Sequence, residues 1–441
     1  MTARKAAFNA LNKVAQGGYS TLVLDSILSR SGLDKRDSAL TSAIFYGVLE
    51  NEQLLDYVIL NHLSKANSRI DNRLIIILRM GVYQIMLMDK IPDNAAVNEA
   101  VKLTRSIGLE RASGLVNAVL RSFIRDGKSC QLPDREDFPQ LYLSLKYSVP
   151  LWLAEKWIDD YGDEMCENIL KELSGRPPIY IRINNLKTDF ESLSNSLAES
   201  NVKANNLSWL DGAAELFETG DIEQLEAYKN GLFHVQDAAS QLCCKLLEAK
   251  SGDTVCDVCA APGGKSFTLT QIMCDCGNVF SYDIYPQKVS LIESGAKRLG
   301  LKSITAKLRD AETGSCDILA DRVLCDVPCS GLGIIRRKPD IKNKQKSDIA
   351  DLPKLQLSIL ENSADLLKPG GVLVYSTCTL SHEENRNVVE SFLSKHSDFE
   401  PYPFDAPCER GEWDSDYMLT LFPHLLGTDG FFIARLKKKG A

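Results

Sequence analysis

The chain has 441 residues, 44% of them hydrophobic and 25% charged, which is the composition of a globular protein with two or three domains. Its formal net charge of −8 excludes nucleic-acid binding through bulk charge, so any such binding must use local basic surface. Its 13 cysteines are too sparse for a secreted disulfide scaffold and no apolar run is long enough for a membrane, so we expect free thiols, a cytoplasmic location and no membrane partner.

Residues 1–132 are predicted to form an all-helical domain. Apolar residues recur there at helical spacing, and breakers such as Gly17-Gly18 and Pro92 separate the runs. The later predicted helices carry an excess of basic side chains, namely Lys102, Arg105, Arg111, Arg121 and Arg125. Charge pattern alone leaves two interpretations open, a solvated helix face or a face that contacts RNA.

Residues 133–150 are predicted as a linker because prolines recur in this range. Residues 151–235 are predicted to form a small α/β module. Its expected elements are helical structure over 151–173, a strand over 179–184, a helix over 189–200, and short strands over 207–209 and 232–235. Arg182 and Asn184 lie at the end of the first of these strands. On sequence alone, a structural capping role and a functional role are equally open for these two residues.

Residues 236–441 show a regular alternation of strands and helices, which predicts an α/β domain with a Rossmann-like, doubly wound sheet. The expected strands are 254–258, 278–283, 304–308, 322–326 and 371–376, and segments 399–402 and 431–436 are expected to close one edge as a hairpin. Ligands of such sheets bind beyond the carboxyl ends of the strands, where the strand order reverses.

The stretch 254–265 (TVCDVCAAPGGK) is the centre of this domain, because a buried strand breaks there into a glycine turn that opens a helix. Adjacent glycines let the main chain approach a ligand, and the start of the helix offers free N–H groups. The spacing fits neither a dinucleotide nor a triphosphate motif, so we predict an adenosine-type cofactor. The candidate residues for binding it are Cys259, Ala260, Ala261, Pro262, Gly263, Gly264 and Lys265.

Polar residues follow the other predicted strands. Asp283 ends the second strand about twenty residues beyond the glycine turn, where an acidic side chain binds ribose hydroxyls. Asp310 follows the third strand and is expected to accept a hydrogen bond from an exocyclic amine. Asp326 and Cys329 follow the fourth strand and Cys378 follows the fifth, so two cysteines are expected to approach one pocket. The alternative for each cysteine is a small buried hydrophobic residue.

Three motifs, AAPGGK at 260–265, DVPCSG at 326–331 and STCT at 376–379, resemble those of the Sun-type RNA cytosine-5 methyltransferases. The helical domain resembles the transcription antitermination factor NusB, and the domain order resembles methyltransferases of small-subunit ribosomal RNA. This resemblance implies S-adenosylmethionine as cofactor and cytosine C5 of 16S ribosomal RNA as target. It further implies that Cys378 is the attacking thiol, that Cys329 assists product release, and that Asp326 holds the base or the cofactor.

The chemistry of cytosine C5 methylation explains why thiols are needed. Cytosine C5 is a weak nucleophile, so a thiolate first adds to C6, and ring restoration then requires an assisting group. The base must also leave its stack, and the basic run 336–346 is expected either to grip phosphates or to be a solvated loop.

Other functions remain open at this stage. A methyltransferase of the same fold could act on tRNA, DNA or protein, and a noncatalytic RNA-binding or ribosome-assembly platform could retain the fold. Cys256 and Cys259 have CxxC spacing without a second pair, so we expect no metal. We also expect a monomer.

Overall fold

The computed structural model describes residues 1–63 and 70–440. The chain forms two compact units, one of Met1–Ser174 with Ile335–Lys344 and the other of Gly175–Ile334 with Gln345–Ala441. Within the described ranges, every helix is too short or too polar to span a lipid bilayer.

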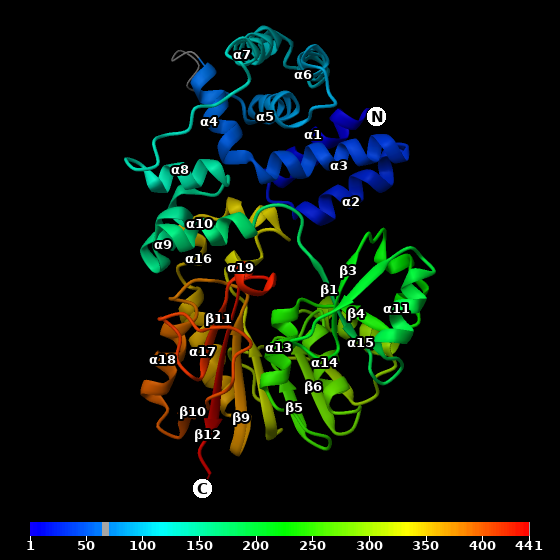
Figure 1. Ribbon diagram of the computed structural model, residues 1–441, viewed down its shortest axis with the longest axis vertical. Coiled ribbons are helices and arrows are strands. Elements are labelled where there is room, and N and C mark those ends of the chain that lie inside the picture. The colour runs from blue at the N-terminus through cyan, green and yellow to red at the C-terminus, as the bar shows by residue number, and fades with distance from the viewer. Residues whose placement is uncertain (64–69, 441) are drawn as a thin grey trace. The chain divides into compact units, whose positions relative to one another are not determined.

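The first unit is helical (Figure 1). Its helices are α1 (Ala3–Val14), α2 (Ser20–Ser31), α3 (Lys35–Glu50), α4 (Glu52–His62), α5 (Asn72–Leu87), α6 (Asp93–Ser106), α7 (Ser113–Arg125), α8 (Pro139–Lys146), α9 (Leu151–Tyr161) and α10 (Asp163–Glu172). The apolar faces of α1 to α7 meet in one core, in which Phe45, Ile77 and Phe123 are fully buried. This arrangement confirms the predicted all-helical domain, because the helical spacing of apolar residues supplies one buried face to each helix.

Helices α8 to α10 differ from the expectation. Helix α8 lies within 133–150, the range predicted as a linker, and its Pro139 occupies the first helical turn, where its missing N–H costs nothing. Gly162, with φ of 80°, separates α9 from α10 within the predicted helical range 151–173. Both helices belong to the helical unit rather than to the sheet that follows them.

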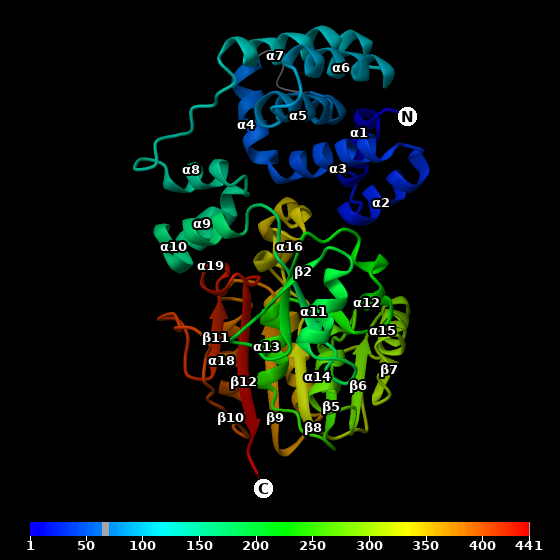
Figure 2. The ribbon, with the colours of Figure 1, turned by 45° about the vertical axis from the view of Figure 1, so that its right-hand side comes forward.

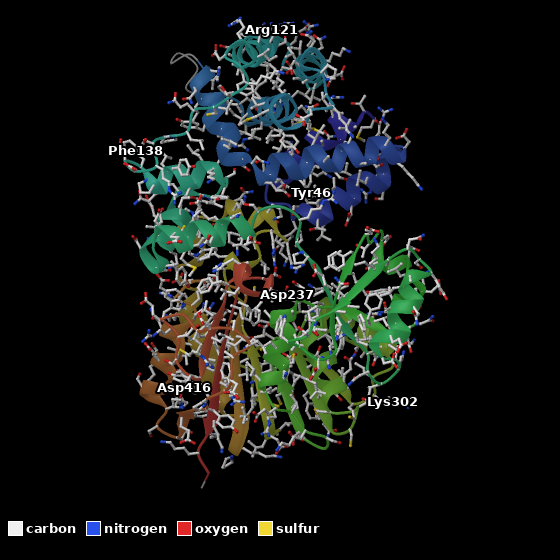
Figure 3. All side chains as sticks on the ribbon, in the orientation of Figure 1. Tyr46, Arg121, Phe138, Asp237, Lys302 and Asp416 are labelled. Atoms are coloured by element: carbon white, nitrogen blue, oxygen red, sulfur yellow. The ribbon has the colours of Figure 1, made fainter. Side chains whose placement is uncertain are left out.

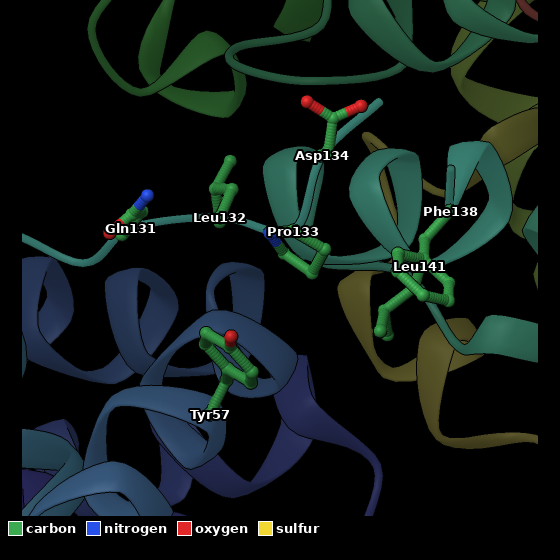
Figure 4. Close-up of a pocket in the computed structure, with 7 residues that line it drawn as sticks. All are labelled: Tyr57, Gln131, Leu132, Pro133, Asp134, Phe138 and Leu141. Atoms are coloured by element: carbon green, nitrogen blue, oxygen red, sulfur yellow. The ribbon is translucent and has the colours of Figure 1, made fainter. Parts of the chain in front are cut away.

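A pocket of about 480 Å³ lies where the chain leaves α7 and enters α8 (Figure 4). Its lining residues are Tyr57, Gln131, Leu132, Pro133, Asp134, Phe138 and Leu141. The carboxylate of Asp134 accepts the N–H groups of Glu136 and Asp137 at 2.8 and 3.3 Å, so it caps the turn before α8.

The segment Ile335–Lys344 comes from the second half of the sequence but packs in the helical unit. Lys342 Nζ donates to the carbonyl oxygens of Glu50 and Tyr147 at 2.9 and 3.2 Å. Burial lowers the pKa of Lys342 to about 8. Neither interpretation of the basic run, phosphate contact or a solvated loop, fits Lys342, whose ammonium group satisfies two carbonyl groups at helix ends.

The second unit begins with a small antiparallel sheet, with strand order β2-β3-β1-β4. Its elements are β1 (Ile179–Ile183), α11 (Phe190–Ala198), β2 (Lys203–Asn206), β3 (Ala213–Phe217), α12 (Glu226–Lys229) and β4 (Phe233–Val235). The predicted strand 207–209 is wrong, because this stretch connects β2 to β3. Strand β2 is an exposed polar edge strand, so it lacks the apolar alternation that sequence analysis detects.

The large sheet has the strand order β10-β12-β9-β8-β5-β6-β7, and β11 also pairs with β12. Its strands are β5 (Thr254–Asp257), β6 (Asn278–Asp283), β7 (Ile304–Leu308), β8 (Ala320–Asp326), β9 (Leu367–Thr377), β10 (Phe399–Pro401), β11 (Met418–Leu421) and β12 (Phe431–Lys438). Strands β5 to β9 are parallel and β12 is antiparallel to β9 and β10. The predicted fold class is confirmed. β10 and β12 pair at one edge as expected, but they do not form a hairpin, because β11 lies between them in the chain and also pairs with β12.

Helices cover both faces of the large sheet (Figure 2). They are α13 (Ala238–Leu246), α14 (Gly264–Ile272), α15 (Pro286–Leu299), α17 (Leu352–Ala364) and α18 (Arg386–Lys395). The short helices α16 (Lys346–Ile349) and α19 (Pro423–Leu426) belong to the connections before α17 and between β11 and β12. On one face Leu324 and Val374 pack with α13 and α14, and on the other Val323 and Tyr375 pack with α17 and α18. The strands are apolar on both sides for this reason.

Asn184 and Arg182 have structural roles in the second unit. Asn184 is fully buried, and its Nδ2 donates to the carbonyl oxygens of Gly231 and Leu299, both at 2.9 Å. It thus joins the small sheet to the end of α15. Arg182 Nη1 donates to the carbonyl oxygen of Asp211 at 2.6 Å, and burial lowers the pKa of this guanidinium.

Replacing Asn184 with alanine leaves two buried carbonyl groups unsatisfied, and we expect it to lower the free energy of unfolding by about 2–4 kcal/mol. Urea unfolding followed by circular dichroism measures this change. Asn205→Ala, on the exposed strand β2, is the matched control and should change the stability by less than about 0.5 kcal/mol. Equal midpoints for both variants would contradict the assigned role of Asn184.

Candidate functional site

The glycine turn lies between β5 and α14, beyond the carboxyl end of the central strand. Gly263 has φ of 109°, and its carbonyl oxygen accepts the N–H of Phe267 at 2.8 Å, which opens the helix. A Cβ at Gly263 would lie 2.4 Å from the ring of Phe267, so only glycine fits this position. The structure therefore places Cys259 to Lys265 as one turn that leads from β5 into α14, as the sequence predicts.

Asp257 ends β5 directly before this turn, and sequence analysis did not single it out. It is fully buried, and its Oδ2 accepts the hydroxyl of Ser266 at 2.7 Å. The hydroxyl of Ser281 on β6 in turn donates to Ser266 at 2.7 Å. Burial raises the pKa of Asp257 to about 7, opposed by the Ser266 hydrogen bond. In the sequence, Asp257 could have been found as the last residue of the strand that precedes the glycines.

Lys265 and Asp326 form an ion pair at the point where the strand order reverses. From β5 the chain proceeds through β6 to β7 and returns on the other side of β5 as β8. Lys265 Nζ lies 2.6 Å from Asp326 Oδ2, and Ser376 donates its hydroxyl to Asp326 Oδ1 at 2.8 Å. Burial opposes the charge on Lys265, but the carboxylate of Asp326 outweighs it and raises the pKa of this lysine above its usual value.

The two predicted cysteines meet beside this ion pair. Cys329 follows β8 and Cys378 follows β9, and their Sγ atoms are 3.3 Å apart. Both thiols are partly exposed. The hydrogen bond to Cys378, together with burial, raises the pKa of Cys329 well above its usual value. The two side chains thus come together as expected, and neither cysteine is a fully buried residue.

Asp283 and Asp310 follow β6 and β7, at the same edge of the sheet but on the other side of the glycine turn. Asp283 is almost fully buried and accepts the N–H of Tyr285 at 3.1 Å. Asp310 lies two residues beyond β7 and accepts the N–H groups of Glu312 and Thr313, which lower the pKa of its carboxyl. The sheet thus orders the cysteines, the ion pair, the glycine turn and the two aspartates along one edge.

The residues at this edge fit a polar cofactor that carries a nucleoside. The glycine turn opens a helix directly after the central strand, and Asp283 presents a carboxylate at the end of the neighbouring strand. All 13 cysteines are free. Within the part of the chain that the structure describes, no group of three or more metal-binding side chains is assembled.

Comparison with protein families divides the chain into three matching regions. Residues 1–125 match the NusB family, residues 149–223 match the ferredoxin-like domain of RsmF/B-like methyltransferases, and residues 244–437 match the family of the 16S rRNA methyltransferases RsmB/F. These matches confirm the resemblance inferred from the three motifs and from the helical domain.

Solved structures share this fold. PH0851 is similar with a TM-score of 0.82 and 26% identity, covering 99% of this chain and 98% of that chain. A methyltransferase homolog protein from Pyrococcus horikoshii is similar with a TM-score of 0.58 and 27% identity, covering 68% of this chain and 99% of that chain.

Curated relatives match along the whole chain. A probable ribosomal RNA small subunit methyltransferase B of Bacillus subtilis is 38% identical over 449 residues, covering 99% of each chain. The ribosomal RNA small subunit methyltransferase B of Escherichia coli O1:K1 is 32% identical over 441 residues, covering 99% of this chain and 98% of that protein. The chain therefore belongs to the family of ribosomal RNA small subunit methyltransferase B.

Proposed function

We propose that this protein methylates C5 of a cytosine in 16S ribosomal RNA through a covalent bond between Cys378 and C6, with S-adenosylmethionine as methyl donor. The observation that carries the proposal is the pair of thiols 3.3 Å apart beside the Lys265–Asp326 ion pair. One thiol adds to the base and the other assists its release, which explains why two cysteines share one site. The family to which the chain belongs supports ribosomal RNA as substrate.

The donor would bind along the β5, β6 and β7 side of the edge. Backbone N–H groups of the glycine turn suit its polar groups, Asp283 suits the ribose hydroxyls and Asp310 suits the adenine amine. When bound, S-adenosylmethionine supplies a methyl group carried on a sulfonium. Because the glycine turn lies between the aspartates and the cysteines, the target base would approach from the β8 and β9 side.

Each residue on the base side has one role in this proposal. The thiolate of Cys378 adds to C6, which makes C5 nucleophilic towards the methyl group. Asp326 holds the cytosine edge, and Lys265 keeps that carboxylate in place. After methylation the C5 proton passes to a water molecule, the electron pair of that C–H bond restores the C5=C6 double bond, and Cys378 leaves C6 as a thiolate that takes up a proton. Cys329 assists this release.

The helical domain would supply RNA affinity. Its basic side chains Lys102, Arg105, Arg111, Arg121 and Arg125 are all exposed. Arg121 projects outward from α7 (Figure 3). This exposure favours an RNA-contacting surface, because phosphate contacts need accessible cations in a protein whose net charge is negative. We place the reaction in the cytoplasm and propose a monomer, since one chain contains every group of the proposed site.

The cysteine roles predict opposite results for two variants. Cys378→Ala should form no covalent adduct with RNA, whereas Cys329→Ala should accumulate one, because release is slowed after addition. A denaturing gel of protein incubated with 16S RNA and S-adenosylmethionine measures both. Bisulfite mapping of ribosomal RNA from cells with and without the protein tests the modified base. An adduct with Cys378→Ala would reverse the two roles.

Asp283→Ala should weaken S-adenosylmethionine binding roughly ten- to hundredfold, because the variant has no charged acceptor for the ribose hydroxyls. Isothermal titration calorimetry measures this affinity, and a thermal melt checks that the variant is folded. Asp317→Ala, at an exposed aspartate before β8, is the control and should bind normally. Equal affinity of the two variants would remove Asp283 from the cofactor site.

Arg121→Glu combined with Arg125→Glu should weaken binding to 16S RNA and flatten its salt dependence. The slope of log affinity against log salt concentration should fall in magnitude by roughly 0.7–0.9 for each phosphate that the variant no longer neutralises. Filter binding at several salt concentrations measures this slope. The control combines Lys35→Glu with Arg36→Glu at the exposed start of α3. Equal weakening by both double variants would show a general charge effect and no RNA surface on α7.

A further inference from the structure

Two adjacent residues, Glu384 and Asn385, lie in the loop between Cys378 and α18. Both are polar and almost fully buried, with 1% and 2% of their surface exposed. Burial of a carboxylate and an amide is costly unless hydrogen bonds compensate for the lost water. The hydrogen-bond partners of Glu384 and Asn385 therefore indicate the roles of these two side chains.

Glu384 holds the loop that carries Cys329. Its Oε2 accepts the backbone N–H of Ser330 at 2.8 Å and the side-chain N–H of Gln356 at 2.9 Å. The same Gln356 amide donates to the carbonyl oxygen of Pro328 at 3.0 Å. The residues on both sides of Cys329 are thus fixed by one carboxylate and its amide partner.

Asn385 holds the loop that carries Cys378 in the same way. Its Oδ1 accepts the hydroxyl of Thr377 at 2.5 Å, and its Nδ2 donates to the carbonyl oxygen of Thr379 at 2.9 Å. These two threonines flank Cys378. The hydroxyls of Ser330 and Thr379, one after each cysteine, are 2.8 Å apart and join the loops directly.

We propose that Glu384 and Asn385 are positioning residues for the two thiols, Glu384 for Cys329 and Asn385 for Cys378. The proposal rests on the cysteine roles proposed above. These roles explain why Glu384 and Asn385, which are adjacent in the chain and buried, contact the loops that follow two different strands. Neither side chain needs to touch the RNA or the methyl donor, since each acts through the backbone that carries a thiol.

Glu384 also places a carboxylate near the thiol of Cys329. The hydrogen bond to Cys378 and burial raise the pKa of Cys329 most, and the negative charge of Glu384 raises it further. Tyr375 on β9 is a further titratable group near this thiol. A raised thiol pKa suits a group that assists release rather than one that attacks.

The first test measures Cys329 without RNA. In a Cys378→Ser background, iodoacetamide labelling of Cys329 is followed against pH by peptide mass spectrometry. Glu384→Gln should lower the midpoint of this profile by about one pH unit, that is about tenfold more thiolate at neutral pH. Glu383→Gln, at the exposed neighbouring residue, is the control and should leave the midpoint unchanged.

A merely structural role of Glu384 would change the labelling rate at high pH without moving the midpoint. An unmoved midpoint, or an equal shift with Glu383→Gln, would overturn the proposal. Because this test uses neither RNA nor S-adenosylmethionine, its result is independent of whether the protein methylates cytosine.

The second test uses the covalent adduct with all cysteines present. Asn385→Ala should form the adduct several-fold more slowly, whereas Glu384→Gln should form it and release it slowly, so that it accumulates. If the alanine variant fails to fold, Thr377→Val removes one of the two hydrogen bonds of Asn385 at nearly unchanged volume and should also slow adduct formation. Accumulation with the Asn385 or Thr377 variant, or failure of Glu384→Gln to form the adduct, would overturn the assignment. Absence of any adduct even with Cys329→Ala would instead refute the proposed function.

Discussion

The ion pair between Lys265 and Asp326 is the interaction on which the site depends. It joins the first turn of α14 to the end of β8 across the point where the strand order reverses. The side chains of Lys265 and Asp326 are 14% and 25% exposed, so each charge is largely shielded from water and would carry the cost of that shielding without its partner. The pair therefore fixes the glycine turn against the strand that leads to Cys329.

The parallel sheet divides the site into two halves. Asp283 and Asp310 lie on one side of the glycine turn, and the two cysteines lie on the other. Because the carboxyl ends of β5 to β9 lie at one edge, donor and acceptor groups from distant parts of the sequence become neighbours. A reaction between two bound molecules requires this placement, since both must be oriented at once.

Sequence patterns were sufficient where residues act locally. The glycine turn at Gly263, the aspartate at the end of β6 and the all-helical first domain each follow from short-range signals, which are periodicity and turn chemistry. Patterns failed where tertiary contacts decide. The edge strand β2 has no apolar alternation, and the basic residue Lys342 is buried among helices that lie far from it in the sequence.

The sequence by itself determined the order of domains, the parallel sheet and the residues that end each strand, because these follow from patterns within a few residues. Only the tertiary structure decided that the thiols of Cys329 and Cys378 touch, and that Glu384 and Asn385 hold their loops. Such contacts join separate strand ends, and buried polar partners leave no periodic signal in the chain.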